Sequence, residues 1–273
     1  MTNFQALILG IVQGITEFLP VSSSGHLVLF QHFFGLSEDM LVFDIFMHFG
    51  SLAAILIVFR TSVINLLKAC GKGITALLHG KSAVAEWFQT NEGRIISAII
   101  VGTLPAVLVG LGFKEQIETL FSSVVPVLFA LSFTGILLIA TFTVKQGDNH
   151  ITPLKGLIIG IAQAIAITPG ISRSGSTIAT ALLMGVERKE SGEFSFLLAI
   201  PAVAGATILA LGDVAECGIS TVVWGPVLIG TIASFLSSWL SLVLLMKIVR
   251  YGKIGYFGFY CLALSLAGFV FLR

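Results

Sequence analysis

Residues 13–26 read QGITEFLPVSSSGH, and this stretch interrupts a segment that is otherwise apolar over about residues 4–35. It holds a carboxylate at Glu17, a proline, three consecutive serines and an imidazole at His26. The apolar pieces on its two sides are about 16 and 11 residues long, and at about 1.5 Å per residue neither piece crosses a bilayer as a helix. Because proline and glycine end helices, the stretch predicts a helix–break–helix hairpin that dips into the membrane and returns.

A second stretch repeats this pattern 150 residues further along the chain, in an apolar segment over about 154–185 that is broken between Pro169 and Gly175. The residues that recur at this offset are Leu7, Ile8, Gly10, Ile11, Gln13, Ile15, Ser22, Ser24, Gly25 and Gly35. A common apolar bias accounts for matching Leu and Ile, but not for the shared Gln, the Ser-x-Ser-Gly pattern and the glycines. The pattern indicates an internal duplication, with a first repeat over 1–145 and a second over 150–273.

The composition is that of a membrane protein. Hydrophobic residues make up 56% of the chain and charged residues 11%, and the mean hydropathy is +1.02. Soluble domains carry about 25% charged residues, so the composition predicts a polytopic membrane protein. Outside the two hairpins, six stretches are long and apolar enough to cross a hydrocarbon core of about 30 Å. They are 41–59, 95–113, 121–144, 194–212, 222–246 and 254–272.

Each repeat therefore contains one hairpin and three crossings. Because three is an odd number, the second repeat is expected to lie upside down relative to the first. The predicted fold is an all-α polytopic integral membrane protein, with six transmembrane helices plus two re-entrant helix hairpins in an inverted-topology repeat. The whole chain, 1–273, is expected to form a single membrane domain.

The distribution of Lys and Arg predicts the orientation of the chain. With the first hairpin opening on one side, twelve of these cations fall on the opposite side, two (Lys114 and Arg273) on the same side, and Arg173 lies in the second break. Cytoplasmic loops are rich in Lys and Arg, so both termini and the mouth of the first hairpin are expected outside. The segment 61–93 then becomes the largest cytoplasmic connection, with a partly amphipathic surface helix around 63–78.

Two classes of site are disfavoured. The net charge of +1 offers no basic surface for nucleic acid. Cys70, Cys217 and Cys261 are far apart in the sequence, which favours neither a disulfide framework nor a thiolate metal site.

The first ten residues lack the cationic flank of a cleavable signal, so the first segment is expected to belong to the mature protein.

The first break carries groups that can move protons or bind a cation. Gln13 and Glu17 are one helical turn apart and share a face, and three serines and His26 follow. Glu17 could be a buried acid that bonds serine hydroxyls, but ionisable groups at membrane depth by default mark a functional site. In that reading it is a general acid or base, or the ligand of a divalent cation. His26 alone would more often be structural, whereas its neighbours favour a functional role.

The second break, PGISRSGST at 169–177, places Arg173 among hydroxyls at the start of a helix. Backbone amides at a helix start, hydroxyls and a planar guanidinium form a receptor for oxyanions, so the pattern predicts a phosphate cradle. The alternative is a guanidinium that clamps backbone carbonyls. A further pair, Asp44 and His48, has helical i,i+4 spacing, and a place in the interfacial region is as well supported as a role in the same cavity.

Together these groups predict hydrolysis or transfer of a phosphate whose other end is a lipid. A diphosphate carries more negative charge than one arginine offsets. A divalent metal, Mg or Ca, is therefore expected, with Glu17 as its protein ligand.

Two motifs resemble a known family. QGITEFLPVSSSGH is similar to the first signature of the bacterial undecaprenyl-diphosphatase (bacitracin-resistance) family, and PGISRSGST, followed by EFSFLLAIP at 193–201, is similar to the second. The similarity extends over essentially the whole chain. The resemblance implies a lipid diphosphate phosphohydrolase of the bacterial inner (plasma) membrane that converts undecaprenyl diphosphate to undecaprenyl phosphate and phosphate. This reaction recycles the carrier lipid for peptidoglycan synthesis, and bacitracin resistance is implied with it.

The resemblance also assigns residues. Glu17, His26 and Arg173 match functional positions of the two motifs, and the hydroxyl contacts that it implies are Ser22, Ser23, Ser172, Ser174 and Thr177. With the residues of the first break added, the expected catalytic residues are Glu17, Ser23, His26 and Arg173, and the expected substrate-binding residues are Gln13, Ser22, Ser24, Ser172, Ser174 and Thr177. The chain departs from the family pattern at Gln13, where the first acid of Glu-x-x-x-Glu would stand. An amide does not transfer protons as a carboxylate does, so a mechanism that needs two carboxylates at 13 and 17 is disfavoured. The attacking group is His26, a serine of 22–24, or a water that they position.

Two rival functions use the same residues. A lipid-phosphate transporter or flippase would share the inverted repeat, the arginine and the hydroxyls. An intramembrane serine hydrolase would use a serine and His26, but it has no need for Arg173. The expected partners are the lipid diphosphate and membrane lipid, with a homodimer as a further expectation.

Overall fold

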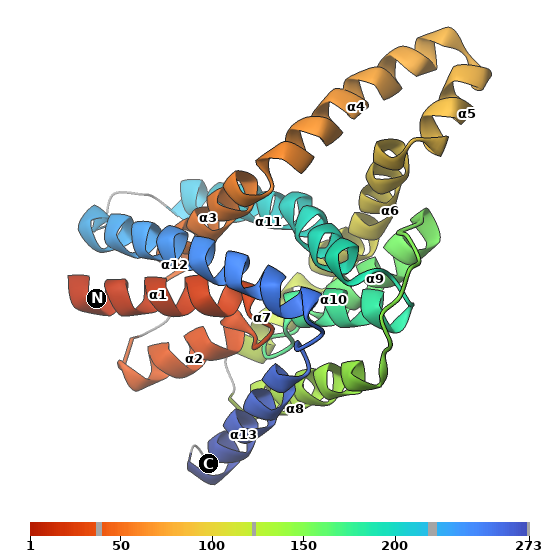
Figure 1. Ribbon diagram of the computed structural model, residues 1–273. Helices are drawn as coiled ribbons and strands as arrows, with labels where there is room; N and C mark the ends of the chain where they lie inside the picture. Colours follow the sequence, from red (N-terminus) through yellow and green to blue (C-terminus); the bar gives the residue numbers. More distant parts are fainter. Residues whose placement is uncertain (37–39, 122–123, 218–222, 272–273) are drawn as a thin grey trace.

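The computed structural model describes residues 1–36, 40–121, 124–217 and 223–271, and helices make up its regular structure (Figure 1). In the first half the helices are α1 (Asn3–Phe18), α2 (Ser23–Phe33), α3 (Leu41–Val58), α4 (Arg60–His79), α5 (Lys81–Gln89), α6 (Asn91–Gly112), α7 (Lys114–Phe121) and α8 (Val124–Ala140). In the second half they are α9 (Pro153–Ile165), α10 (Arg173–Leu183), α11 (Arg188–Cys217), α12 (Trp224–Arg250) and α13 (Tyr256–Phe271). A single 3₁₀ turn, η1 (Thr141–Thr143), follows α8.

Both predicted hairpins are present as short helix pairs. Helix α1 begins with a capping box between Thr2 and Gln5 and ends just before the Leu19–Pro20 dipeptide, as expected because proline disfavours a helical residue before it. Helix α9 begins with Pro153 behind the cap residue Thr152, where the missing proline N–H costs nothing. The breaks between the paired helices fall where the sequence predicts them.

The duplicated Ser-x-Ser-Gly pattern starts the second helix of each hairpin. Ser22 Oγ accepts a hydrogen bond from the Gly25 amide at 3.3 Å, and Ser172 Oγ accepts one from the Gly175 amide at 3.1 Å. The first and second serines of each pattern also lie 3.2 Å apart, Oγ to Oγ, in both hairpins. The shared residues therefore have a local structural cause, since a serine cap satisfies an amide that the helix leaves free.

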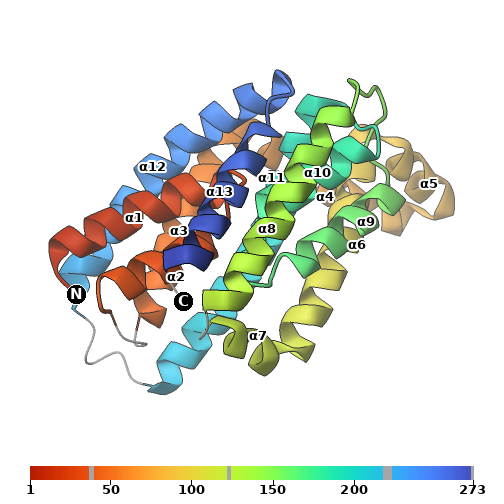
Figure 2. The same cartoon turned by 90° about the horizontal axis from the view of Figure 1, so that it is seen from below.

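The packing of the two hairpins is reciprocal. Helix α1 packs along α12, which belongs to the second half, and α9 packs along α6, which belongs to the first (Figure 2). Gly10 faces Gly230 of α12, and its counterpart Gly160 faces Gly102 of α6, so that in both places two backbones meet with no side chain between them. Helices α8 and α13, the last helices of the two halves, also pack together. The inverted orientation of the repeats and their division at 1–145 and 150–273 stay predictions.

The chain is a multi-pass membrane protein. Four described helices are long and apolar enough to cross a bilayer, namely α6, α8 with η1, α11 and α12. The pair α3 and α4 supplies a fifth candidate, although it bends by 82° between Val58 and Arg60. In its described part, each of the six predicted crossings falls on a helix, whereas residues 122–123, 222 and 272 of these stretches, like Arg273, lie outside the described residues. Helix α13 has only 16 residues, so the count of six crossings plus two hairpins stays a prediction.

Helices α4 and α5 form an arm that projects from the bundle (Figure 1). The arm confirms a helix around the predicted segment 63–78. Its two helices are joined by a hydrogen bond from Trp87 Nε1 to the Ala69 carbonyl at 2.9 Å, and the Trp87 ring lies against Gly73.

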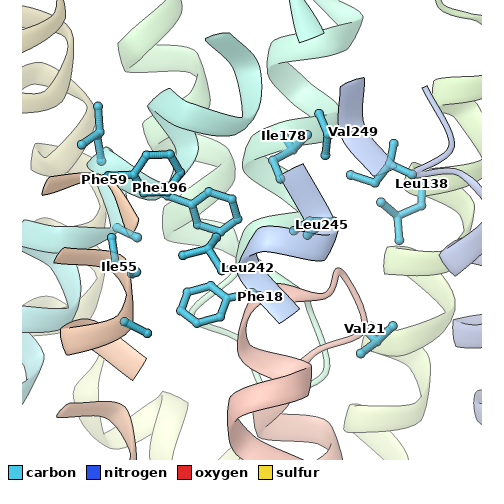
Figure 3. Close-up of a cluster of buried hydrophobic side chains, with 14 of the residues drawn as sticks. Phe18, Val21, Ile55, Phe59, Leu138, Ile178, Phe196, Leu242, Leu245 and Val249 are labelled. Atoms are coloured by element: carbon cyan, nitrogen blue, oxygen red, sulfur yellow. The ribbon is translucent and has the colours of Figure 1, made fainter. Parts of the chain in front are cut away.

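A buried apolar cluster lies directly beside the first break (Figure 3). Phe18, the last residue of α1, is 1% exposed and packs edge-to-face on Phe196 of α11, with ring centroids 5.6 Å apart. Ile55, Ile178 and Leu242 bring α3, α10 and α12 into the same cluster. Because Phe18 is fixed among four other helices, the residue before it, Glu17, has a defined position.

Candidate active site

Glu17 is the centre of a cluster that joins the two hairpins. It lies on the last turn of α1 and is 8% exposed. Its Oε1 forms an ion pair with the guanidinium of Arg173, the first residue of α10. Its Oε2 accepts hydrogen bonds from Ser23 Oγ at 2.6 Å and from Gln13 Nε2 at 3.1 Å. The predicted convergence of the two breaks is therefore confirmed for the carboxylate and the guanidinium.

The ion pair explains how both charges remain in an apolar bundle. The side chains of Glu17 and Arg173 are 7% and 21% exposed. A charge moved away from water is tolerated when an opposite charge and hydrogen bonds compensate it, and Glu17 has three such partners. In the alternative reading Arg173 binds only backbone carbonyls. The structure differs from it, because the guanidinium pairs with the carboxylate of Glu17.

Ser23 is the serine of the first break whose hydroxyl reaches Glu17. The 2.6 Å distance is typical of a hydroxyl that donates to a carboxylate. The two neighbouring serines have other partners in the described structure. Ser22 caps α2, and Ser24 Oγ lies 3.2 Å from Ser22 Oγ and 3.5 Å from the Gly170 amide of the other hairpin. The three serines therefore have different surroundings.

His26 is expected beside Glu17, but no bond from its ring to Glu17 is found among the described residues. Its Nδ1 donates to the Ser22 carbonyl at 2.8 Å, and its Nε2 lies 2.8 Å from the hydroxyl of Tyr260 on α13. Since a carbonyl only accepts, Nδ1 carries the proton and Nε2 of the neutral ring accepts from Tyr260. Both ring nitrogens are thus engaged, one by the first break itself and the other by α13.

The imidazole that does face Glu17 is His48 on α3. Its Nε2 lies 3.8 Å from Glu17 Oε2, and its Nδ1 donates to the backbone carbonyl of Asp44 at 2.8 Å. The Asp44 carboxylate in turn accepts from Gln31 Nε2 at 3.2 Å. Of the two readings of the Asp44 and His48 pair, the structure favours membership of the same cluster. The i,i+4 spacing was the only signal in the sequence, and it does not locate α3 beside α1.

The hydroxyls of the second break shape the backbone around Arg173. Ser172 caps α10, and its amide donates to Thr134 Oγ1 of α8 at 3.0 Å. Thr134 Oγ1 also donates to the Gly170 carbonyl at 3.2 Å. Thr177 Oγ1 donates to the Arg173 carbonyl at 2.9 Å, and Ser174 pairs with Ser172. Ser172, Ser174 and Thr177 are at most 5% exposed, and Thr134, a single threonine in an apolar helix, gave no signal in the sequence.

The two repeats contribute different chemistry at equivalent positions. At the 150-residue offset, Ile167 stands where the first hairpin has Glu17, and Arg173 stands where it has Ser23. The carboxylate and the hydroxyl therefore come from one hairpin and the guanidinium from the other. The site depends on the packing of both hairpins, and neither could form it alone.

The donor set does not fit a resident Mg or Ca ion at Glu17. The described residues contain no group of three or more His, Cys, Asp or Glu side chains that could hold a metal. Glu17 is the one carboxylate at the centre of the cluster, and the Arg173 guanidinium that balances it would repel a cation. Gln13 Oε1 is a buried oxygen without a partner, but an amide carries no charge. Ca²⁺ needs many oxygen ligands, and Mg²⁺ held by a single carboxylate depends on the phosphates of a substrate for others.

A separate cavity of about 220 Å³ lies between α6 and α11. It is lined in part by His150, Glu190 and Glu193. Glu190 Oε2 accepts from His150 Nδ1 at 2.8 Å, and Glu193 accepts from Ser62. None of the residues that contact Glu17 lines it, so this cavity is distinct from the cluster around Glu17.

Comparisons with known proteins agree on one family. The model of the bacitracin resistance protein BacA family matches residues 6–267. The chain is 40% identical to an undecaprenyl-diphosphatase of Carboxydothermus hydrogenoformans over 95% of this chain and 94% of that protein. It is also 40% identical to one of Desulforapulum autotrophicum, over 99% and 100% of the two chains, and 37% identical to one of Halothermothrix orenii, over 96% and 95%. With a matched family model and relatives that span its whole length, this chain belongs to the bacitracin resistance protein BacA family.

Proposed function

We propose that the chain hydrolyses undecaprenyl diphosphate to undecaprenyl phosphate and phosphate, and so recycles the carrier lipid used in peptidoglycan synthesis. The single observation that carries the proposal is the cluster in which Ser23 donates to Glu17 while Glu17 pairs with Arg173 across the two hairpins. A hydroxyl bonded to a carboxylate beside a guanidinium suits transfer of a phosphoryl group. The names of the relatives, all undecaprenyl-diphosphatases, support the same substrate.

Arg173 and the start of α10 bind the terminal phosphate in this proposal. A guanidinium presents several N–H groups in one plane, so Arg173 can donate to phosphate oxygens while it keeps its bond to Glu17. Its charge stabilises the negative charge that develops on the transferred group. The hydroxyls of Ser22, Ser24, Ser172, Ser174 and Thr177 and the amide of Gln13 are the proposed substrate-binding groups, and several of them act by holding the break in shape.

Ser23 is the proposed nucleophile, and Glu17 is its general base. Ser23 Oγ attacks the terminal phosphorus and passes its proton to Glu17. The bond from that phosphorus to the bridging oxygen breaks, and undecaprenyl phosphate leaves with the electron pair. Water then attacks the phosphoserine, which releases phosphate and restores the Ser23 hydroxyl. The engaged ring nitrogens of His26 support Ser23 over His26 as the attacking group; a water positioned by Glu17 is the alternative.

The proposed location of the site is the outer side of the bacterial inner membrane. The support is the excess of Lys and Arg on the opposite side, which also favours an outer location of both termini. The prenyl chain would remain among the apolar helices while the diphosphate enters the site. A divalent cation, Mg or Ca, would then be carried by the diphosphate itself, because the donor set around Glu17 does not fit a resident ion.

A phosphate-release assay on purified protein in detergent tests the proposal. Wild type should release phosphate from undecaprenyl diphosphate, and Ser23→Ala, Glu17→Ala and Arg173→Ala should each reduce the rate by about 10²-fold or more. Ser132→Ala is a matched control, because that hydroxyl pairs with Ser265, at 2.8 Å, and not with Glu17. Detergent removes any gradient, so a flippase without hydrolytic activity would release no phosphate, and that result would reject the proposal.

Acid quenching during turnover separates the serine from the water mechanism. With substrate labelled on the terminal phosphate, wild type should retain label on Ser23, and Ser23→Ala should retain none. Two results together would assign the attack to water: wild type turns over without any labelled protein, and Ser23→Ala keeps a rate near that of wild type.

A further inference from the structure

Ser22 has an unusual backbone conformation. Its φ is +66°, and it is the one residue other than glycine with a positive φ in the described part of the chain. Such a conformation persists in an L-residue only where the surroundings impose it, and it is frequent at functional sites. Ser22 directly precedes Ser23, so its backbone sets the direction in which the Ser23 hydroxyl points.

His26 is the group that holds this conformation. The Ser22 carbonyl accepts from His26 Nδ1 at 2.8 Å and from the His26 amide at 3.2 Å. His26 is 5% exposed, so its ring has little freedom to leave this position. Two bonds from one residue to one carbonyl fix the peptide plane between Ser22 and Ser23.

Helix α13 holds His26 in turn. The Tyr260 hydroxyl donates to His26 Nε2 at 2.8 Å, and the two rings are nearly parallel, with 8° between their planes. The next residue, Cys261, donates to the Pro20 carbonyl at 3.6 Å. Two successive residues of α13 therefore contact the first break. Tyr260 binds His26, which follows Ser22, and Cys261 binds Pro20, which precedes it.

The second break is a comparison within the same molecule. It has the same capping serine, but Ser176 stands in place of His26, and its hydroxyl is buried without a partner among the described residues. The capping residue Ser172 has a φ of −76°, an ordinary value. The positive φ and the imidazole thus occur together at the break that carries Ser23, and both are missing at the equivalent positions of the other.

We propose that Tyr260 is a positioning residue, which acts through His26 to hold the Ser22 backbone so that the Ser23 hydroxyl points at Glu17. This inference rests on the proposed function and deepens it, since it gives His26 a positioning role in place of attack on phosphorus. Loss of the Tyr260 hydroxyl frees His26 Nε2, loosens the ring and lets the Ser22 peptide turn toward a negative φ. A displacement of about 1 Å at a reacting group costs about 10²-fold in rate, whereas binding of the diphosphate by Arg173 is unaffected.

The kinetic test compares Tyr260→Phe with Tyr256→Phe. Both changes remove one hydroxyl from α13, but Tyr256 packs against Phe142, away from the break. Tyr260→Phe should lower kcat by about 10- to 100-fold with KM within about twofold of wild type, and Tyr256→Phe should stay within about twofold in both. In a His26→Ala background Tyr260→Phe should have no further effect, because the connection is already broken. Equal kinetics for the two tyrosine variants, or effects of His26→Ala and Tyr260→Phe that multiply, would overturn the proposal.

Amide hydrogen exchange gives a test that does not depend on turnover. Tyr260→Phe should increase exchange in peptides covering 19–27 and leave peptides covering 169–177 unchanged, since only the first break is held by an imidazole. Unchanged exchange at 19–27 would reject the role of Tyr260. If wild type released no phosphate while exchange at 19–27 rose as expected, the proposed function would fail and the mechanical connection would stand.

Discussion

Glu17 and Arg173 form an ion pair although 156 residues separate them in the chain. Glu17 lies on the last turn of α1 and Arg173 begins α10, so the pair joins the two hairpins at their breaks. The two breaks share a sequence pattern at an offset of 150 residues, but at the equivalent positions the first has Glu17 and Ser23 where the second has Ile167 and Arg173. A site of this kind needs opposite charges from two segments, and their pairing also makes the burial of each charge tolerable.

Arg173→Lys should reduce phosphate release by about 10²-fold or more, because an ammonium is a point charge and cannot grip phosphate oxygens and Glu17 in one plane. The rate measured with undecaprenyl diphosphate in detergent checks this. Arg188→Lys is the matched control; Arg188 starts α11 and lies against Gly252, remote from the cluster. Turnover of Arg173→Lys close to that of Arg188→Lys would remove Arg173 from phosphate recognition.

The two breaks, their helix starts and the meeting of Glu17 with Arg173 could be predicted from the sequence, because Pro, Gly and Ser act locally and the duplication related the two segments. The place of His26 could not. Its closeness to Glu17 along the chain favoured a position beside that carboxylate, but its ring nitrogens bond to Ser22 and to Tyr260 of α13. His48, Thr134 and Tyr260 lie on separate helices, and their proximity to the breaks follows from tertiary packing that periodicity does not encode.

Glu17→Gln should abolish most activity and also destabilise the fold. The amide keeps the shape of the side chain, but it cannot take the proton of Ser23 and leaves the Arg173 guanidinium without its counter-ion. We expect a rate loss of about 10²- to 10³-fold and a loss of about 1–3 kcal/mol in the free energy of unfolding, since Arg173 is partly exposed and water compensates in part. Thermal unfolding in detergent and phosphate release measure the two effects. Glu17→Asp, which keeps the charge, should lose less stability than Glu17→Gln; the reverse order would contradict the ion pair as the cause.

Divalent cations should not stabilise the protein in the absence of substrate. The donor set around Glu17 does not fit a resident ion, and an ion that binds the folded state raises the unfolding temperature by mass action. We therefore expect the same unfolding temperature in excess chelator and in about 1 mM Mg²⁺ or Ca²⁺, a concentration at which a resident site would be filled. Glu17→Ala is the control, because any shift caused by non-specific ion effects should persist in it. A shift of several degrees in wild type that disappears in Glu17→Ala would establish a metal site at this carboxylate.

Gly10→Ala and Gly160→Ala should destabilise the protein by similar amounts. A methyl group at Gly10 would collide with the backbone of Gly230 on α12, and one at Gly160 would collide with the backbone of Gly102 on α6. Backbone atoms cannot move aside as side-chain ends can, so each helix pair has to separate, at a cost of about 1–3 kcal/mol. Gly205→Ala is the matched control, because it lies within α11 with open space around it, and a helical alanine is favoured over glycine by about 1 kcal/mol. The unfolding temperature in detergent should therefore fall for the first two variants and should stay level or rise for the third. If only one of the two equivalent glycines proved sensitive, the two hairpins would not be stabilised by equivalent contacts, which would contradict the reciprocal packing as a source of stability.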